Sequence, residues 1–131
     1  MATAETYKGK IELYNPATQV DLTTDYLTIF EIIHEGFIDM MKLSFNNLSD
    51  VVVKVTIDGE TYYEFNLEDL KNQVKLTKDE QDTFMNTASN SFCDSYPTPL
   101  FFESSIKVEV KKLSGNRKIK GGIIRYRLKG D

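Results

Sequence analysis

One short segment constrains the fold of this chain more than any other. In Val51–Ile57 every second residue is valine or isoleucine, which is the period of a strand with one buried face. Asp58 and Gly59 follow, a pair that favours the type I′ turn of a two-residue hairpin, and Thr61–Phe65 provides the returning strand. The segment therefore predicts antiparallel β-structure, and it carries no group that suggests catalysis.

Further segments with strand character follow at regular spacing. β-Branched or alternating patterns predict strands over Tyr7–Tyr14, Tyr26–Ile33, Phe37–Phe45, Ser105–Leu113 and Lys118–Lys129. Gly121 and Gly122, inside the last of these strands, indicate a bulge or a close approach of another backbone. Seven or eight short strands at this spacing predict an all-β fold, an antiparallel β-sandwich or jelly roll.

Irregular structure is predicted for the connection between the hairpin and the Ser105 strand. The expected elements are a short helix capped by Asn66 over Leu67–Gln73, a second helix opened by a capping box at Thr77 over roughly Lys78–Thr87, and a Ser/Asn-rich loop over Asn86–Ser95. Pro97 and Pro99 then predict an extended entry segment, because proline cannot donate to a sheet ladder.

The length of 131 residues fits a single domain. We expect residues 1–25 to form an N-terminal arm with a first edge strand, and residues 26–131 to form the sandwich. No apolar run approaches the ~20 residues of a membrane-spanning helix. The first residues also lack the basic and apolar regions of a signal peptide. We therefore expect no membrane contact.

Single cysteine and histidine residues exclude several classes of site. With only Cys93 and only His34, the chain has no intrachain disulfide, no Cys/His zinc site and no Ser-His-Asp triad. Glu31, Glu35 and Asp39 surround the histidine, and a metal or general-acid site is one interpretation of this acidic stretch. The mixed spacing matches no ligand geometry, so we expect a solvated turn.

Two more polar features have ordinary explanations. Asp58, Gly59 and Glu60 resemble half of a calcium loop, but the rest of that motif is absent and a hairpin turn accounts for them. Cys93 lies beside Asp94 without a basic neighbour, so nothing in the sequence lowers the pKa of its thiol and we expect it to be inert. We accordingly predict no catalytic residue, no metal and no cofactor.

Charge is distributed unevenly along the chain. Residues 1–104 contain 7 Lys/Arg against 18 Asp/Glu, whereas residues 105–131 contain 9 against 2. The basic set is Lys107, Lys111, Lys112, Arg117, Lys118, Lys120, Arg125, Arg127 and Lys129. A solvated sheet face, pairing with acidic neighbours in the sheet, or a charge-matched protein interface each explains it. Nucleic acid is not favoured, because Tyr126 is the one aromatic residue among these basic strands.

The aromatic residues allow two interpretations. Tyr62, Tyr63, Phe65, Tyr96, Phe101 and Phe102 are candidates for a carbohydrate-binding surface or for ordinary packing. Strand alternation places Tyr62 on the opposite face from Tyr63 and Phe65, so the six residues cannot form one platform. The chain has no tryptophan, and we therefore favour packing.

Three segments together resemble a recurring pattern of virion proteins. They are the strand Gly36–Phe45, the hairpin Val51–Phe65 closed by Asn66–Leu70, and Tyr96–Val110 followed by a Ser-Gly-Asn turn and a glycine-containing last strand. This combination is similar to the small β-sandwich accessory proteins of tailed bacteriophages, which include capsid decoration or auxiliary proteins and head–tail components. The basic last strands are not a feature of that whole family.

The resemblance implies a structural, non-enzymatic virion component. It implies synthesis in the host cytoplasm, an auxiliary or decoration role, and contact with the major capsid protein, neighbouring virion subunits or further copies. The expected interface residues are Lys111, Lys112, Arg117, Lys118, Lys120, Arg125, Arg127 and Lys129. Alternatives are a head–tail connector, a tail-associated protein, a carbohydrate-binding module for a host surface, or an enzyme, for which Glu35 and Asp39 are the only candidates.

Overall fold

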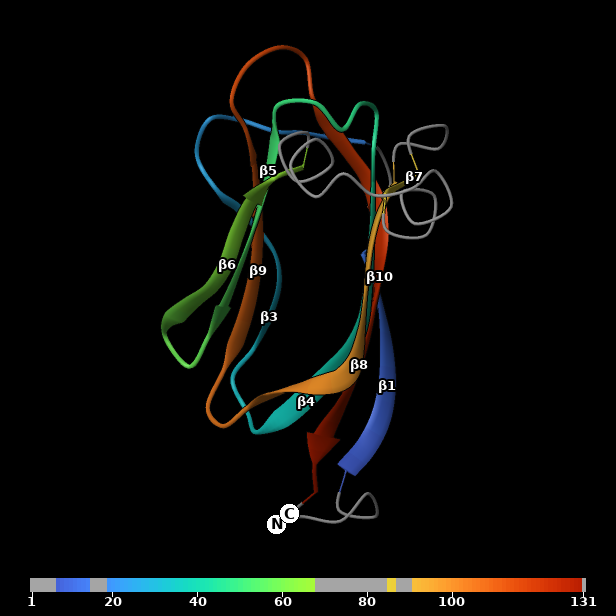
Figure 1. Cartoon of the computed structure of the whole chain (residues 1–131), viewed down its shortest axis with the longest axis vertical. Coiled ribbons are helices and arrows are strands. Elements are labelled where there is room, and N and C mark those ends of the chain that lie inside the picture. The colour runs from blue at the N-terminus through green and yellow to red at the C-terminus, as the bar shows by residue number, and fades with distance from the viewer. Residues whose placement is uncertain (1–6, 15–18, 68–84, 87–90, 131) are drawn as a thin grey trace.

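Two antiparallel sheets face one another in this protein. The computed structural model describes residues 7–14, 19–67, 85–86 and 91–130, with side chains for 19–67 and 100–130. The sheets enclose the interior as a sandwich (Figure 1). The all-β prediction is thereby confirmed. In the described part of the chain, no helix has the length and apolar character needed to cross a membrane.

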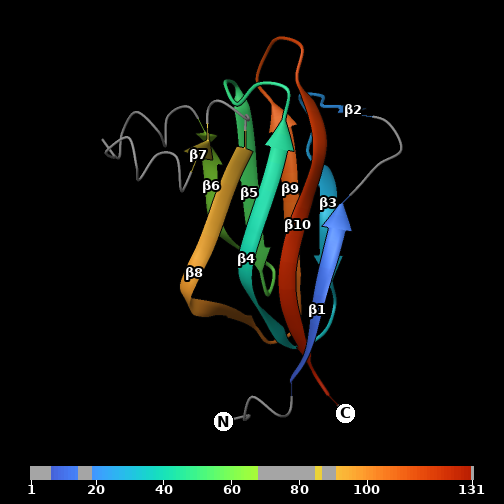
Figure 2. The same ribbon diagram turned by 90° about the vertical axis from the view of Figure 1, so that its right-hand side faces the viewer.

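The larger sheet has six strands, with the last strand of the chain inside it. Its order is β1 (Tyr7–Tyr14), β10 (Lys118–Lys129), β4 (Gly36–Phe45), β8 (Ser91–Phe102) and β7 (Met85–Asn86). The short strand β2 (Val20–Asp21) pairs with the beginning of β10, on the side where β1 pairs with the rest of it. Figure 2 shows β10 between β1 and β4.

The smaller sheet has four strands. Their order is β3 (Leu27–Ile32), β9 (Ile106–Lys112), β5 (Val51–Ile57) and β6 (Glu60–Asn66). The predicted hairpin is confirmed, because Asp58 and Gly59 both have positive φ, 52° and 83°, as a type I′ turn requires. Gly59 supplies that conformation without steric cost.

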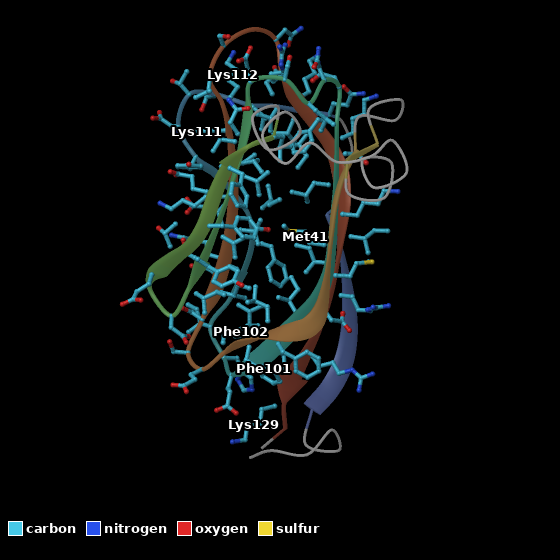
Figure 3. The ribbon with its side chains drawn as sticks, in the orientation of Figure 1. Met41, Phe101, Phe102, Lys111, Lys112 and Lys129 are labelled. Atoms are coloured by element: carbon cyan, nitrogen blue, oxygen red, sulfur yellow. The ribbon has the colours of Figure 1, made fainter. Side chains whose placement is uncertain are left out.

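Alternate residues of both sheets form one apolar core. Val53 and Val55 of β5 meet Met41, Leu43 and other large side chains from β4, β8 and β10. Met41 and Phe102 lie between the sheets in Figure 3. Phe30 of β3 and Tyr126 of β10 pack edge to face with ring centroids 5.3 Å apart, which joins the two sheets directly. The period-2 patterns therefore did predict the buried faces.

The connection before Ser105 differs from its prediction. Met85 and Asn86 form strand β7, so the second helix does not extend to Thr87, and the predicted Asn86–Ser95 loop is wrong because β8 begins at Ser91. The rest of both predicted helices lies outside the described residues, apart from Leu67, which is fully buried.

Strand β8 accommodates its two prolines through an irregularity. Its register with β4 jumps from Ile38↔Leu100 to Met40↔Ser95, so Pro97 and Pro99 fall where the ladder is interrupted. Proline is tolerated at such bulges because no ladder hydrogen bond is lost there. The bulge predicted from Gly121 and Gly122 is confirmed in β10, where the register shifts between Ile119 and Gly121.

Candidate functional site

The basic residues of the last two strands do not form one patch. Lys111 and Lys112 lie at the end of the sandwich opposite to Lys129 (Figure 3). The burial pattern of β10 alternates, so Arg125, Arg127 and Lys129 are exposed on the outer face of the larger sheet. The eight predicted interface residues therefore divide into groups with different neighbours.

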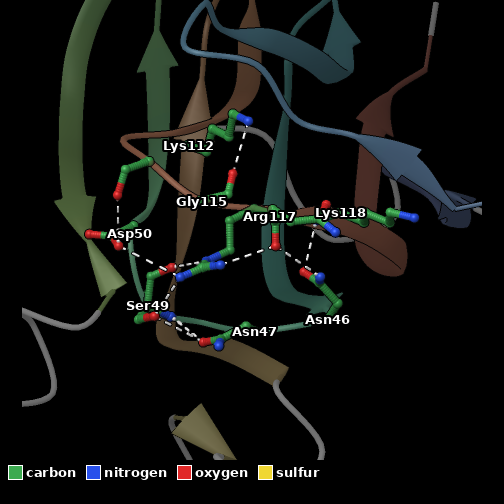
Figure 4. A network of polar contacts seen from close by, with 10 residues as sticks. Asn46, Asn47, Ser49, Asp50, Lys112, Gly115, Arg117 and Lys118 are labelled. Carbon is green, nitrogen blue, oxygen red and sulfur yellow. Dashed lines mark hydrogen bonds and ion pairs between the residues drawn. The ribbon is translucent and has the colours of Figure 1, made fainter.

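Arg117 holds two loops together inside the molecule. Its guanidinium donates to the Ser49 carbonyl oxygen and to Ser49 Oγ at 2.9 Å, and it lies 3.6 Å from the Asp50 carboxylate (Figure 4). Only 14% of its side chain is exposed. These contacts join the β4–β5 loop to the start of β10. We therefore assign Arg117 a structural role.

Asn46 extends the same network. Its backbone N–H donates to the Lys118 carbonyl oxygen at 3.1 Å, its side-chain oxygen accepts the Lys118 N–H at 2.8 Å, and its amide donates to the Asn116 carbonyl oxygen at 3.1 Å (Figure 4). Ser114 Oγ also donates to Asp50 at 3.1 Å. This end of the sandwich is thus closed by hydrogen bonds between residues far apart in the sequence.

Lys111 and Lys112 are also engaged within the chain. The Lys111 ammonium lies 4.6 Å from the centroid of the Tyr26 ring, which Lys54 approaches to 5.2 Å. Burial, and then the hydrogen bond that the hydroxyl donates to Glu64, raise the pKa of Tyr26. Lys112 Nζ donates to the Gly115 carbonyl oxygen at 2.9 Å. Both lysines therefore stabilise their own end of the smaller sheet.

Acidic residues of neighbouring strands and of the β3–β4 turn pair with several cations of the larger sheet. Arg125 Nε lies 2.7 Å from Asp39 of β4, Lys129 lies 3.2 Å from Glu35, and Lys118 lies 3.8 Å from Asp21 of β2. Much of the uneven charge along the sequence is consequently neutralised within the sheet. Exposed pairs of this kind contribute little to stability, about 0–1 kcal/mol each.

Arg127 differs from these cations. It is exposed, and the residues whose side chains are described provide it with no ionic partner. Its register partner in β4 is Phe37, which is itself opposite Phe101 of β8. The Phe37 and Phe101 rings are 5.2 Å apart, and Phe101 is 54% exposed. Arg127, Phe37 and Phe101 therefore form a row across three strands, which we call the outer row.

The acidic stretch around His34 spans the turn between β3 and β4, with Glu31 in β3, Asp39 in β4, and His34 and Glu35 in the turn itself. His34 Nε2 donates to the Lys129 carbonyl oxygen at 2.8 Å, and Glu35 and Asp39 are the ion-pair partners of Lys129 and Arg125. The described residues contain no group of three or more potential metal ligands. The structure thus gives these side chains partners within the fold.

Asp58 does more than form a turn. Its carboxylate accepts the backbone N–H groups of Glu103, Ser104 and Ser105, the closest at 2.7 Å, and the Ser104 hydroxyl at 3.0 Å. The Asp58 N–H donates in return to the Ser105 carbonyl oxygen at 2.9 Å. The tip of the β5–β6 hairpin is therefore fastened to the β8–β9 loop, a role that the Asp-Gly pattern does not reveal.

These hydrogen bonds, first that from the Ser104 N–H, lower the pKa of Asp58 to about 2 although partial burial opposes the shift. A depressed pKa means that the stabilisation is present above the unfolded value near 3.8 and is lost as the pH falls toward 2. We expect Asp58→Asn to lower the free energy of unfolding at neutral pH by about 1 kcal/mol, because an exposed carboxylate is partly screened.

The measurement is urea unfolding of the wild type and Asp58→Asn between neutral pH and pH 2. Asparagine tolerates the positive φ of this position, so the difference should shrink as the pH falls. Glu60→Gln, at an exposed carboxylate after the same turn, is the control and should show no such convergence. A difference that stays constant with pH would contradict the role of the charge.

The candidate aromatic residues are separated in space. Phe102 is 1% exposed and belongs to the core, whereas Tyr62 is 57% exposed on β6 of the other sheet. Tyr63 and Phe65 stack on one another at 5.0 Å. Cys93 and Tyr96 lie in residues 91–99 of β8, for which the backbone alone is described, and Cys93 is the register partner of Lys42. No single aromatic platform results from the described members of this set.

Comparisons with known proteins leave the family open. No protein-family model matches the chain, and no curated protein matches it. A solved structure, dimeric latent PorU from Porphyromonas gingivalis, aligns with a TM-score of 0.48 and 8% identity. The alignment covers 95% of this chain and 13% of that protein. A likeness at this level carries no argument about function.

Proposed function

We propose that this chain is a structural, non-enzymatic virion subunit of the accessory type found in tailed phages, and that it binds a neighbouring subunit through the outer face of its larger sheet. The observation that carries the proposal is the outer row, in which Arg127 lies beside a largely exposed phenylalanine. Aromatic residues and arginine are enriched at protein interfaces and dominate their energetics.

Neighbouring positions support this choice of face. Ile123 of β10 is 37% exposed, two positions before Arg125. The register places Leu13 of β1 opposite Ile123, and Ile11 opposite Arg125. The face thus combines exposed apolar surface with cations, whereas the outer face of the smaller sheet alternates charges of both signs, as in the row Glu109, Lys54 and Glu64.

An auxiliary or decoration protein on the capsid shell is the role we favour, because the resemblance of the hairpin and the Tyr96–Val110 segment points there. A position at the head–tail junction uses the same kind of surface. A carbohydrate-binding role is not favoured, because its candidate aromatic residues are separated. The ratio of this chain to the major capsid protein in purified particles tests the proposal: a chain absent from particles would refute it.

Replacing both ends of the outer row should abolish particle binding without unfolding the protein. We expect Phe101→Ser with Arg127→Glu to weaken incorporation about thirtyfold or more, the effect of losing a contact worth about 2 kcal/mol. Quantitative gel analysis of purified particles measures incorporation, and thermal melting checks the fold. Tyr62→Ser with Lys107→Glu is the matched control, since both residues belong to the smaller sheet, where Tyr62 is 57% exposed and the Lys107 side chain is 38% exposed.

Comparing the two variants shows whether a loss of incorporation is specific to the outer face of the larger sheet. Normal incorporation of the outer-row variant would reject this face as the contact site. Equal loss in both variants would instead indicate a general effect of surface substitution. Arg125 is left unchanged in this test, because its reversal would place two carboxylates together at Asp39.

A further inference from the structure

Sheet edges in this protein are mostly interrupted. In the smaller sheet, β3 and β6 each show a register shift against their single neighbour, at Thr28/Phe30 and at Val55/Thr56. In the larger sheet, the strand that the described residues place beyond β8 is the two-residue β7, and β8 is itself bulged and contains two prolines. Bulges, short edge strands and prolines, like charged side chains, are devices that prevent a further strand from adding to an edge.

The edge formed by β1 has no bulge and no proline and is eight residues long, and its only protection of this kind is its charged residues, which oppose strand addition unless a partner strand pairs them. All eight residues pair with β10 in one uninterrupted register, from Tyr7↔Lys129 to Tyr14↔Gly122. On its other side, the described part of the chain provides no strand. A regular edge of this length presents a row of backbone donors and acceptors to an added strand. The contrast with the other three edges indicates that this one is used.

We propose that β1 pairs with β1 of a second copy of this chain, antiparallel and centred on Ile11, so that the two larger sheets become one. In this register Ile11 meets Ile11 of the second copy, and Lys10 lies opposite the second copy's Glu12. The symmetry repeats the Lys10–Glu12 pair, as in any two-fold interface. Directly opposite cross-strand pairs of unlike charge are stabilising.

The charge pattern favours this occupant over other arrangements. A parallel, in-register pair would place Lys8 against Lys8 and Lys10 against Lys10, and like charges directly opposite are destabilising. Within one copy, the register partners of Lys10 and Glu12 are Tyr126 and Ile124, which carry no charge. Neither register partner in β10 can therefore form a directly opposite ion pair with them, whereas an antiparallel second copy provides complementary charges.

Charge reversal tests both the partner and the register. Sedimentation equilibrium of the purified chain should show a dimer at high concentration. Lys10→Glu and Glu12→Lys should each weaken the dimer about tenfold, because two attractive pairs become repulsive. The double variant Lys10→Glu with Glu12→Lys restores unlike pairs in swapped positions, and its affinity should return close to that of the wild type.

Each contrary result overturns the inference. A chain that stays monomeric at every concentration has no self-pairing edge. Single variants that dimerise normally, or a double variant that fails to recover while its circular dichroism is unchanged, exclude this register. A dimer lost in Phe101→Ser with Arg127→Glu forms through the outer row instead. The inference does not depend on the virion proposal, because it is tested in the isolated protein.

Discussion

Replacing Phe102 with alanine is expected to lower the free energy of unfolding by about 3–5 kcal/mol, the usual cost of removing a buried phenylalanine. Phe102 is 1% exposed and lies between the sheets near the lower end of Figure 3. The variant loses the transfer free energy of the ring and leaves a cavity that the two sheets cannot close. Urea denaturation followed by circular dichroism measures the loss.

Phe101 provides a control one position away in the same strand. Its ring is 54% exposed and contacts Phe37 on the outer face. We expect Phe101→Ala to cost about 1 kcal/mol, because little area is buried and one aromatic pair is lost. Equal losses of stability in the two variants would mean that Phe101 and Phe102 do not point to opposite faces of the larger sheet.

Replacing Gly36 with alanine should destabilise the protein by about 3 kcal/mol, near the upper end of the cost of overpacking. A Cβ atom at this position would lie 2.3 Å from the Arg127 carbonyl oxygen and 3.1 Å from both Leu128 Cδ2 and Phe102 Cζ. The side chains can rotate away, but the carbonyl belongs to the neighbouring strand. The ladder between β4 and β10 must therefore open locally. Thermal unfolding should show a much lower midpoint.

Gly59→Ala separates this steric effect from the loss of a flexible residue. No atom lies within 4 Å of a Cβ built on Gly59, but φ there is +83°. The expected cost is about 1–2 kcal/mol, from backbone conformation alone. If Gly36→Ala is as stable as Gly59→Ala, or more stable, the close approach of β4 and β10 is contradicted.

Local patterns predicted those parts of the fold that depend on local physics. The period of Val51–Ile57 identifies a buried face because alternate residues of a strand point the same way. Asp58-Gly59 identifies its turn because two consecutive residues need positive φ. The same reasoning failed for the first half of β8, where serine and asparagine suggested a loop. There the partner β4 supplies the ladder, and a bulge absorbs the prolines.

Long-range contacts account for what the sequence did not reveal. In the sequence, Arg117 could not be told apart from the other basic residues of the last strands. Its hydrogen bond to Ser49, in a loop distant along the chain, is what distinguishes it. Asp58 gains its second role from backbone N–H groups of residues 103–105, which no spacing rule connects to the turn. The outer row likewise requires the register of three strands that are distant in the chain.

The interior position of β10 determines when the protein can fold. β10 leaves the ribosome after every other strand of the sandwich, yet it separates β1 from β4 in the larger sheet. Until it emerges, β1 has no partner among the described strands and one side of β4 is open. Closing the sheet also requires contacts between the two ends of the sequence, which slow folding. The larger sheet therefore cannot close before β10 has been synthesised, and until then the sides of β1 and β4 that it later covers are open to pairing with other strands.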